Sequence, residues 1–365
     1  MANRANRATV VFASTETFEA GDQLAACLRR HKVRVTLFRP PASGGLAKGL
    51  RRVSGLVYDH IDESLRDDPE GPDIAGLRRA VADPGVVGVQ ATDQTLEPLV
   101  AAVAGDAAVV QRVCAAPDPM GMIDKRWQAD VAQSAGLLVP QVWRDPAEVT
   151  DFPVLVKPIL GGGGTGIRAA ADRAELAEAW ADAARDDATY FIQQRVLGRT
   201  MHVGGVAHQG EPVVIAAYEG EGPQQFGQIS SGRVVVDEPA VTAATAFLRA
   251  AGYTGIFCFD LIRTESGEHY FIEVNPRIFG SWMTLQLAGV DVVGAYLFAL
   301  GLAERPLTAT PDYATTWQLK HPSEATAGQL LKAGLGRVRT MRPYLGWRGS
   351  AVMTVDLVAH IRRTR

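Results

Sequence analysis

Residues 257–281, FCFDLIRTESGEHYFIEVNPRIFGS, constrain the fold of this chain more than any other stretch. Two runs of alternating apolar residues flank Ser266 and Gly267, a dipeptide that suits a tight reversal. The pattern therefore predicts a β-hairpin whose strands are residues 257–264 and 268–275.

The predicted register brings polar side chains to one face of the hairpin. It places Asp260 opposite Glu273 and Cys258 opposite Asn275, and side chains alternate between the faces of a strand, so Asp260, Glu273 and Asn275 share one face. Directly opposed carboxylates repel, and a bound cation removes that penalty. The other face is apolar and carries the expected pairs Phe259–Val274 and Leu261–Ile272.

The expected ligands Asp260, Glu273 and Asn275 all offer oxygen, and no Cys or His stands at a useful spacing, so the site favours Mg²⁺ or Mn²⁺ over Zn²⁺. Mg²⁺ sites of this kind usually hold substrate phosphates as well. Pro276 then gives the strand a rigid exit that places Arg277 beside the expected metal. The alternative is a solvated hairpin face that carries its acids by chance.

Composition bounds the class of protein. The chain of 365 residues suggests two or three domains, and 47% hydrophobic residues suffice for packed cores. A net charge of −3 argues against a broad nucleic-acid-binding surface, so no nucleic-acid partner is expected. The 3 cysteines lack a CxxC spacing, and the sequence contains neither a signal peptide nor an apolar run of membrane-spanning length. We therefore expect a soluble, cytoplasmic protein with no membrane contact.

The first part of the chain alternates strand and helix patterns. The expected strands are residues 9–13, 33–38, 55–58 and 86–91, and the expected helices are residues 18–31, 74–82 and 96–104. This order predicts a small parallel sheet flanked by helices. The residues Ser14 to Thr17 stand where a dinucleotide-binding domain has its glycine fingerprint, so this region is expected to be a scaffold or a wall on the substrate side.

A glycine-rich loop follows the apolar strand 152–158, which contains Lys157 near its end. The loop consists of Gly161, Gly162, Gly163, Gly164, Thr165 and Gly166. It is no Walker A motif, because Ile167 replaces the lysine, and no Rossmann loop, because residues 167–172 precede the next helix. In protein kinases the lysine follows the loop, whereas Lys157 precedes this one. The remaining hypothesis is a β-loop-β flap whose N–H groups close over phosphates, and a flexible linker is the alternative.

The rest of the chain divides by pattern into further strands, helices and domains. The expected strands are a short apolar one that opens residues 190–198, then residues 201–206 and 213–217, with a loop at 219–232. Helices are expected after residues 122–125 through Ser134, and at 173–185, 240–251 and 289–302. The predicted domains are residues 1–117, a βαβ domain; 118–190, which carry the glycine flap; 191–305, which carry the metal site; and 306–365, a C-terminal appendage.

Six motifs then follow one another along the chain. They are Asp124-Lys125; Val154-Leu155-Val156-Lys157-Pro158; the glycine flap; Phe191-Ile192-Gln193-Gln194-Arg195-Val196-Leu197-Gly198; Phe259-Asp260-Leu261; and Phe271-Ile272-Glu273-Val274-Asn275-Pro276-Arg277. In this order they resemble the ATP-grasp superfamily, in particular its carboxylate–amine ligases. The resemblance covers residues 122–301 and implies an ATP-grasp fold, of class α/β and α+β, with residues 1–117 as the N-terminal βαβ (pre-ATP-grasp) domain.

The resemblance also implies a role for each matching residue. Phosphates of ATP are expected at Lys125, Lys157 and the six flap residues; adenine at Gln193, Gln194, Arg195 and Val196; Mg²⁺ at Asp260, Glu273 and Asn275; and the transferred phosphate at Arg277 and Lys157, the two catalytic candidates. The family often has an acidic residue where this chain has Gln193-Gln194. Thr200 and His202 are the candidates for the ribose contact, and His202 is counted with the ATP-binding residues.

The expected activity is an ATP-dependent ligation. A carboxylate is a poor acyl donor, so phosphoryl transfer from ATP would first convert it into an acyl phosphate, which an amine then attacks to give an amide. The expected cofactors are ATP and Mg²⁺ or Mn²⁺, and the expected partners are small-molecule carboxylate and amine substrates, such as an amino acid or small peptide. A homodimer is an open alternative to a monomer.

Three other activities remain open from the sequence. They are a carboxylating enzyme that resembles biotin carboxylase, an ATP-binding regulatory module without turnover, and a dehydrogenase that uses the GxGxxG match. Individual residues also have two interpretations each. Arg233 either clamps a substrate carboxylate or is solvated, Trp282 either packs on substrate or begins a helix in the core, and His321 is not expected to line the substrate pocket.

Overall fold

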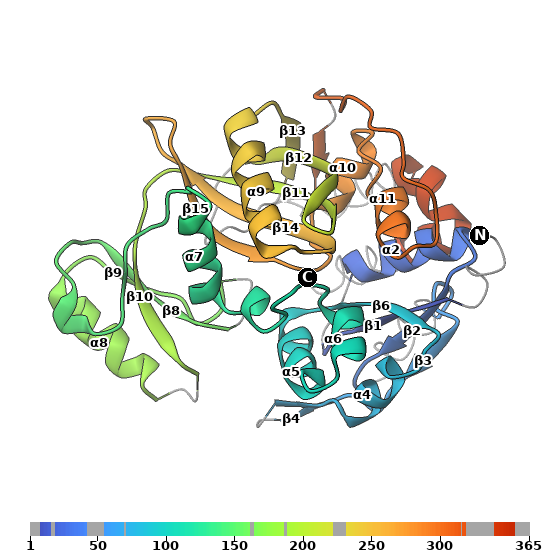
Figure 1. Cartoon of the computed structure of the whole chain (residues 1–365), viewed down its shortest axis with the longest axis horizontal. Coiled ribbons are helices and arrows are strands. Elements are labelled where there is room, and N and C mark those ends of the chain that lie inside the picture. Colours follow the sequence, from blue (N-terminus) through green and yellow to red (C-terminus); the bar gives the residue numbers. More distant parts are fainter. Residues whose placement is uncertain are drawn as a thin grey trace.

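The computed structural model describes residues 8–15, 19–41, 55–68, 71–160, 164–185, 188–221, 231–314, 316–318 and 339–354. Figure 1 shows an N-terminal sheet (blue) at the lower right, a second sheet (green) at the left, and a long antiparallel sheet (yellow to orange) between and above them. The candidate site lies on the long sheet, so its surroundings depend on how the other two parts meet it.

All four strands of the N-terminal sheet are parallel, in the order β3-β2-β1-β6. They are β1 (Thr9–Ala13), β2 (Arg34–Phe38), β3 (His60–Asp62) and β6 (Val86–Ala91). Successive residues of β1 belong to different cores, because α2 (Glu19–Arg30) packs on one face of the sheet and three helices cover the other. Those helices are α4 (Ala75–Val81), α5 (Asp93–Val103) and α6 (Ala107–Val113). The parallel sheet flanked by helices is thus confirmed.

The strand expected at residues 55–58 is wrong. Residues 55–57 form a turn, and the third strand begins only at His60. Tyr58 is buried all the same, because its hydroxyl donates to Asp22 Oδ1 at 2.7 Å and its ring packs edge-on against Phe12. The apolar pattern therefore reflects a turn packed against the core. The small hairpin of β4 (Arg66–Asp68) and β5 (Gly71–Asp73), together with α6, has no counterpart in the sequence analysis.

The second sheet has the strand order β7-β10-β8-β9 and carries the glycine loop. Its strands are β7 (Val142–Trp143), β8 (Val154–Pro158), β9 (Arg168–Ala170) and β10 (Tyr190–Gln194), with α8 (Arg173–Ala183) and the 3₁₀ turn η2 (Pro146–Glu148) beside them. A separate core of nine buried residues, among them Val154, Val156 and Leu176, holds this part together. Because β8 and β9 pair antiparallel on either side of the loop, the β-loop-β arrangement is confirmed.

The long sheet has six strands in the order β15-β14-β11-β12-β13-β16. They are β11 (Arg199–His208), β12 (Glu211–Glu221), β13 (Ser231–Val235), β14 (Gly255–Arg263), β15 (His269–Asn275) and β16 (Thr316–Gln318). The helix α9 (Glu238–Ala251) covers one face, where Phe247 packs on Phe259 and Phe271. The other face meets α10 (Trp282–Leu287) and α11 (Val292–Ala299). The helix α7 (Lys125–Ser134) lies beside β15 (Figure 1), and the 3₁₀ turn η1 (Gly121–Ile123) contacts α7.

Several expectations for the long sheet need adjustment. The loop expected at 219–232 overlaps two strands, because β12 continues to Glu221 and β13 begins at Ser231, and residues 222–230 lie outside the described residues. The helix expected at 289–302 is only α11, and α10 precedes it with Trp282 as its first residue. The side chain of Trp282 is fully buried, which confirms the core interpretation for this residue. Residues 339–354 are helical, and His321 lies outside the described residues.

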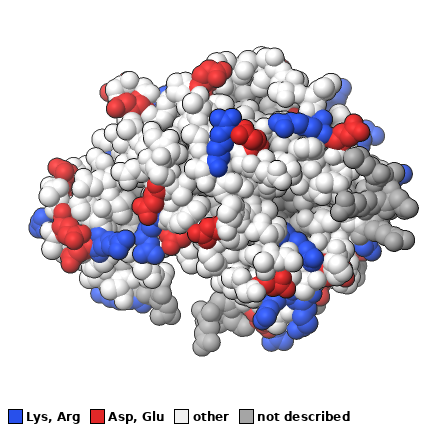
Figure 2. Space-filling view, viewed as in Figure 1, with Lys and Arg blue, Asp and Glu red and all other residues white. Residues whose placement is uncertain are grey.

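The surface shown in Figure 2 mixes both signs of charge. Lys and Arg alternate with Asp and Glu over this face, in keeping with the net charge of −3. No helix among the described residues combines the length and the apolar character that crossing a membrane requires. The absence of nucleic-acid and membrane partners stays a prediction.

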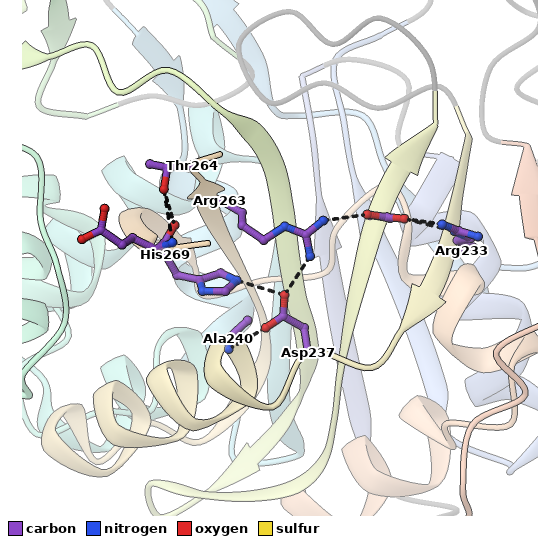
Figure 3. Close-up of polar contacts among 8 residues, drawn as sticks. Arg233, Asp237, Ala240, Arg263, Thr264 and His269 are labelled. Atoms are coloured by element: carbon purple, nitrogen blue, oxygen red, sulfur yellow. Dashed lines mark hydrogen bonds and ion pairs between the residues drawn. The ribbon is translucent and has the colours of Figure 1, made fainter. Parts of the chain in front are cut away.

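A row of alternating charges ties one end of the long sheet to the start of α9 (Figure 3). Arg233 pairs with Glu219 at 2.6 Å, and Arg263 bridges Glu219 at 3.4 Å and Asp237 at 3.3 Å. Asp237 Oδ2 also lies 2.9 Å from His269 Nε2. The Asp237 side chain caps α9, because it accepts from the N–H of Ala240. Glu219 and Asp237 are only 9% and 5% exposed, so both acids depend on these partners. Arg233 is therefore ion-paired with Glu219. The sequence analysis expected it either to clamp a substrate carboxylate or to be solvated, and did not predict this pair.

Replacing Arg263 tests this row of charges. Arg263→Met would remove the cation that the two buried carboxylates share, and breaking such a buried pair costs about 3 kcal/mol. The free energy of unfolding in urea should fall by that order. Arg249→Met is the matched control, because the Arg249–Glu211 pair is mostly exposed and should leave the unfolding midpoint nearly unchanged. Equal midpoint shifts for both variants would contradict the role given to Arg263.

Candidate active site

The two candidate carboxylates lie where the sequence places them. Strands β14 and β15 pair antiparallel with Asp260 opposite Glu273 and Cys258 opposite Asn275, and the chain reverses through Gly267, whose φ of 87° favours glycine. This part of the predicted hairpin is confirmed. The opposed acids are therefore held by backbone pairing in a sheet rather than by a loop.

One predicted pair is wrong because β15 contains a bulge. The register shifts after Asp260, so Leu261 pairs with Phe271 and not with Ile272. Phe271 is 1% exposed and joins Phe259 and Val274 in the core under α9. An aromatic ring thus takes the place expected for Ile272, and the extra residue leaves Glu273 on the polar face.

Glu273 interacts electrostatically with two buried lysines from different parts of the chain. Lys125, the first residue of α7, places Nζ 3.7 Å from Glu273 Oε2 and donates to the carbonyl of Ile159 at 3.4 Å. Lys157, in β8, is 2% exposed and donates from Nζ to Gln193 Oε1 at 3.2 Å. The structure therefore brings together Lys125, Lys157 and Glu273, as predicted from residues that are up to 148 positions apart in the sequence.

Burial perturbs both signs of charge in this cluster. Burial raises the pKa of Glu273 above its usual value, although Lys125 and Lys157 oppose the shift and Asp260 adds to it. Burial likewise lowers the pKa of Lys157, against the attraction of Glu273. Desolvation therefore outweighs the attraction between the partners. A ligand that carries a divalent cation and phosphate charges would compensate both groups at once.

His202 and Cys258 lie against Asp260, contrary to expectation. His202 Nδ1 is 2.8 Å from Asp260 Oδ1. The atoms of His202, Cys258 and Asp260 that could bind a metal lie within 4.8 Å of one another. The sequence analysis found no Cys or His at a useful spacing, yet β11 pairs with β14 and sets His202 opposite Asp260. Sequence spacing within one hairpin cannot reveal a neighbouring strand. The ribose contact of His202 stays a prediction.

Tyr218 supports His202 from the next strand. The two rings stack with centroids 5.0 Å apart, and the Tyr218 hydroxyl lies 2.6 Å from Ser281 Oγ and 3.2 Å from Cys258 Sγ. Burial raises the pKa of Tyr218 well above its usual value, so the phenol keeps its proton. Asp260 is thus backed by a packed row of side chains that the sequence analysis did not identify.

Arg277 is held by the N-terminal domain. Its guanidinium donates two hydrogen bonds to Asp93, the first residue of α5, and a third to Asn275 Oδ1 at 3.0 Å. Gln90 Oε1, near the end of β6, accepts from the N–H of Ile278 at 2.7 Å. The sequence analysis missed Asp93, although its position just after a parallel strand, where such sheets commonly bind ligands, was an available signal.

The nucleotide segments are described in part. Gly161, Gly162 and Gly163 lie outside the described residues, whereas Gly164 and Gly166 each have a φ of 76°, which suits glycine. Thr165 lies in the turn between them. In the adenine segment, Gln194 N–H donates to Gln141 and Arg195 N–H donates to Pro153, both within the fold. The N–H of Val196 makes no hydrogen bond with another described residue.

A small cavity adjoins the cluster where the domains meet. It has a volume of about 20 Å³, enough for one water molecule, and its lining includes Asp93, Lys125, Gln128, Glu273 and Asn275. Three segments that are distant in the sequence contribute to it: the start of α5, the first turns of α7 and the end of β15. The acids, the lysine and the amides therefore line one small space.

Comparison with known proteins identifies the class of this fold. The family model of the ATP-grasp domain matches residues 122–281. The L-amino acid ligase from Bacillus licheniformis superposes with a TM-score of 0.59 at 19% identity, over 80% of this chain and 74% of that one. Residues 122–281 thus form an ATP-grasp domain, and the resemblance inferred from the six motifs is confirmed.

Curated relatives match this chain over a limited length. Pyruvate carboxylase from Pichia angusta is 27% identical over 181 residues, which are 45% of this chain and 15% of that protein. D-alanine–D-alanine ligase from Pediococcus pentosaceus is 30% identical over 141 residues, which are 36% of this chain and 40% of that protein. The chain spans well under half of the length of these relatives.

The Asp93–Arg277 pair is open to a double-mutant cycle. The side chains of Asp93 and Arg277 are 13% and 17% exposed. Removing either charge would therefore leave the other buried without its ion-pair partner. Asp93→Asn alone should lower the free energy of unfolding by about 3 kcal/mol. With Arg277→Gln added, the total loss should be smaller than the sum of the single losses by about 1–3 kcal/mol in urea unfolding. Additive losses would show that the pair is not coupled.

Proposed function

We propose that this protein is an ATP-dependent carboxylate–amine ligase that forms an amide through an acyl phosphate and releases ADP and phosphate. The observation that carries the proposal is the cluster of Lys125, Lys157 and Glu273 beside Asp260. Its charges are buried without full compensation, which is unfavourable in a protein that binds nothing there. Perturbed charges in such a cleft are typical of a functional site.

Bound ATP would supply what the cluster lacks. Its phosphates would lie at Lys125 and Lys157, under the flap that includes Gly164, Thr165 and Gly166. Backbone N–H groups in such a loop bind phosphate oxygens well. Adenine would meet residues 193–196, where the N–H of Val196 makes no hydrogen bond with another described residue.

The residues around Glu273 fit a hard divalent cation. Asp260 and Glu273 oppose each other on adjacent strands, and Asn275 offers an amide oxygen two residues further on. Mg²⁺ prefers such oxygen ligands and usually shares them with substrate phosphates. When bound, the cation would neutralise phosphate charge during the transfer. Asn275 Oδ1 also accepts from Arg277, which therefore orients it toward the same place.

The chemistry then needs positioning and charge neutralisation more than covalent catalysis. An oxygen of the substrate carboxylate would attack the γ-phosphorus of ATP, and the bond from that phosphorus to the β-γ bridging oxygen would break to release ADP. The amine nitrogen would next attack the acyl carbon, lose a proton and expel phosphate. Lys125, Lys157 and Arg277 would stabilise the negative charge that moves between these groups.

Similarity to pyruvate carboxylase favours a second candidate. In a carboxylating enzyme, bicarbonate would take the place of the organic acid at the same phosphoryl-transfer site. The two candidates share the nucleotide site and differ only in the acid that receives the phosphoryl group. The similarity to D-alanine–D-alanine ligase supports the amide-forming alternative over a region of comparable length.

Product analysis with libraries of acids and amines tests the proposal. The protein with ATP and Mg²⁺ should release ADP and phosphate only when an organic acid is present, and hydroxylamine should trap the activated acid as a hydroxamate. Glu273→Gln should lower turnover by about 10²-fold or more, because it removes an anion that holds the cation. Formation of AMP and pyrophosphate would contradict the acyl phosphate. ADP release driven by bicarbonate alone would instead support the carboxylating candidate.

The raised pKa of Glu273 predicts a pH dependence of Mg²⁺ binding. Metal ligands must be deprotonated, and this carboxyl holds its proton to a higher pH than the usual 4.5 of a glutamate. The apparent Mg²⁺ affinity, followed through the rise in melting temperature, should therefore fall while the pH is still above 4.5. Glu273→Gln should lack this step. A wild-type affinity that stays constant down to pH 4.5 would contradict the prediction.

A further inference from the structure

The strand β15 is an edge strand that needs partners on its outer side. It pairs only with β14 in the long sheet, yet Phe271 and Val274 are buried at 1% and 2% exposure. A buried backbone N–H or C=O without a partner is costly. Phe271 N–H donates to the carbonyl of Leu138 at 2.8 Å, which satisfies one end of the edge.

The side-chain amide of Gln128 satisfies the other end. Its Oε1 accepts from Val274 N–H at 3.0 Å, and its Nε2 donates to the carbonyl of Val274 at 2.9 Å. Nε2 also donates to the carbonyl of Met122 at 2.8 Å. One amide thus pairs with both backbone groups of Val274, as a neighbouring strand would, and Gln128 is 2% exposed.

The bulge in β15 explains why a side chain is needed at this point. Outward-facing amides normally recur at every second residue of a strand. Here the outward amides are those of Phe271 and Val274, three positions apart, because the register shifts between them. The carbonyl of Leu138 accepts a hydrogen bond from the first amide, and Gln128 Oε1 accepts one from the second. The shifted position of Glu273 is therefore fixed on both sides.

Gln128 also connects the ligand strand to the helix of Lys125. Lys125 and Gln128 are three residues apart in α7 and therefore lie on one side of that helix. Val274 stands between Glu273 and Asn275, the two candidate ligands in β15. The same amide thus sets the distance between the lysine and the carboxylate, which is 3.7 Å from Nζ to Oε2.

We propose that Gln128 is a positioning residue that fixes Glu273 and Asn275 relative to Lys125, so that these groups bind the cation and the phosphates together. This inference rests on the proposed function for the identity of the ligands. Gln128 itself would not touch ATP or the cation, because all three of its observed hydrogen bonds go to backbone groups. Its effect on the ligands would pass through the backbone of Val274.

Substitution of Gln128 tests the inference with two readouts. Gln128→Met keeps the volume and removes all three hydrogen bonds, and Gln128→Asn keeps the amide one methylene too short to reach Val274. Both variants should speed hydrogen exchange at the Val274 amide. Both should also raise the Mg²⁺ concentration for half-maximal ADP release by about tenfold, as loss of an outer-shell partner does. Gln286→Met is the matched control, since Gln286 is equally a buried helix glutamine that accepts from a backbone N–H, at Val293.

The readouts separate this inference from the proposed function. Gln286→Met should leave both exchange at Val274 and the Mg²⁺ dependence at wild-type values. Wild-type exchange at Val274 in the Gln128 variants would overturn the inference, and it needs no turnover to be measured. Faster exchange with an unchanged Mg²⁺ dependence would also overturn it. A wild-type protein without ATP turnover would instead count against the proposed function. The exchange experiment would then decide whether Gln128 fixes the backbone of Val274. Gln128→Asn decides the matter if Gln128→Met does not fold.

Discussion

The site depends on one unfavourable arrangement: two carboxylates opposed across neighbouring strands, with two lysines buried beside them. Backbone pairing of β14 and β15 enforces the opposition of Asp260 and Glu273. Burial then shifts the pKa of Glu273 upward and that of Lys157 downward, so desolvation outweighs the attraction between these groups. A fold that maintains such an arrangement gains stability when a cation and an anionic ligand enter together.

The surrounding structure keeps this arrangement from relaxing. Asp93, at the start of α5, and Gln90, in β6, hold the segment after β15 through Arg277 and Ile278. On the other side, Tyr218 and His202 back Asp260 by stacking and hydrogen bonding. The N-terminal part of the chain therefore contributes to the site, because the carboxylate of Asp93 orients Arg277 next to the candidate ligands. The geometry of the site therefore depends on residues from α5, β6, β11, β12, β14 and β15 together.

Local patterns in the sequence predicted the elements better than their contacts. The hairpin with Asp260 opposite Glu273 follows from alternation and a Ser-Gly turn, and the parallel N-terminal sheet follows from the order of strands and helices. The bulge at Ile272 could not be predicted, since it depends on which of two apolar residues fits under α9. His202 was named as a candidate ATP-binding residue. Its contact with Asp260 could not be predicted without knowing that β11 pairs with β14. Contacts over 146 or 184 positions, made by Gln128 and Asp93, leave no local pattern.

The most direct test of the account is a calorimetric titration of ATP into the protein with and without Mg²⁺. If the opposed acids and buried lysines exist to hold a cation with phosphates, ATP should bind one site per chain, and Mg²⁺ should tighten binding by about tenfold or more, a coupling of roughly 1.4 kcal/mol. Asp260→Asn should remove most of that gain. ATP binding of equal strength with and without Mg²⁺, or unchanged in Asp260→Asn, would contradict the account.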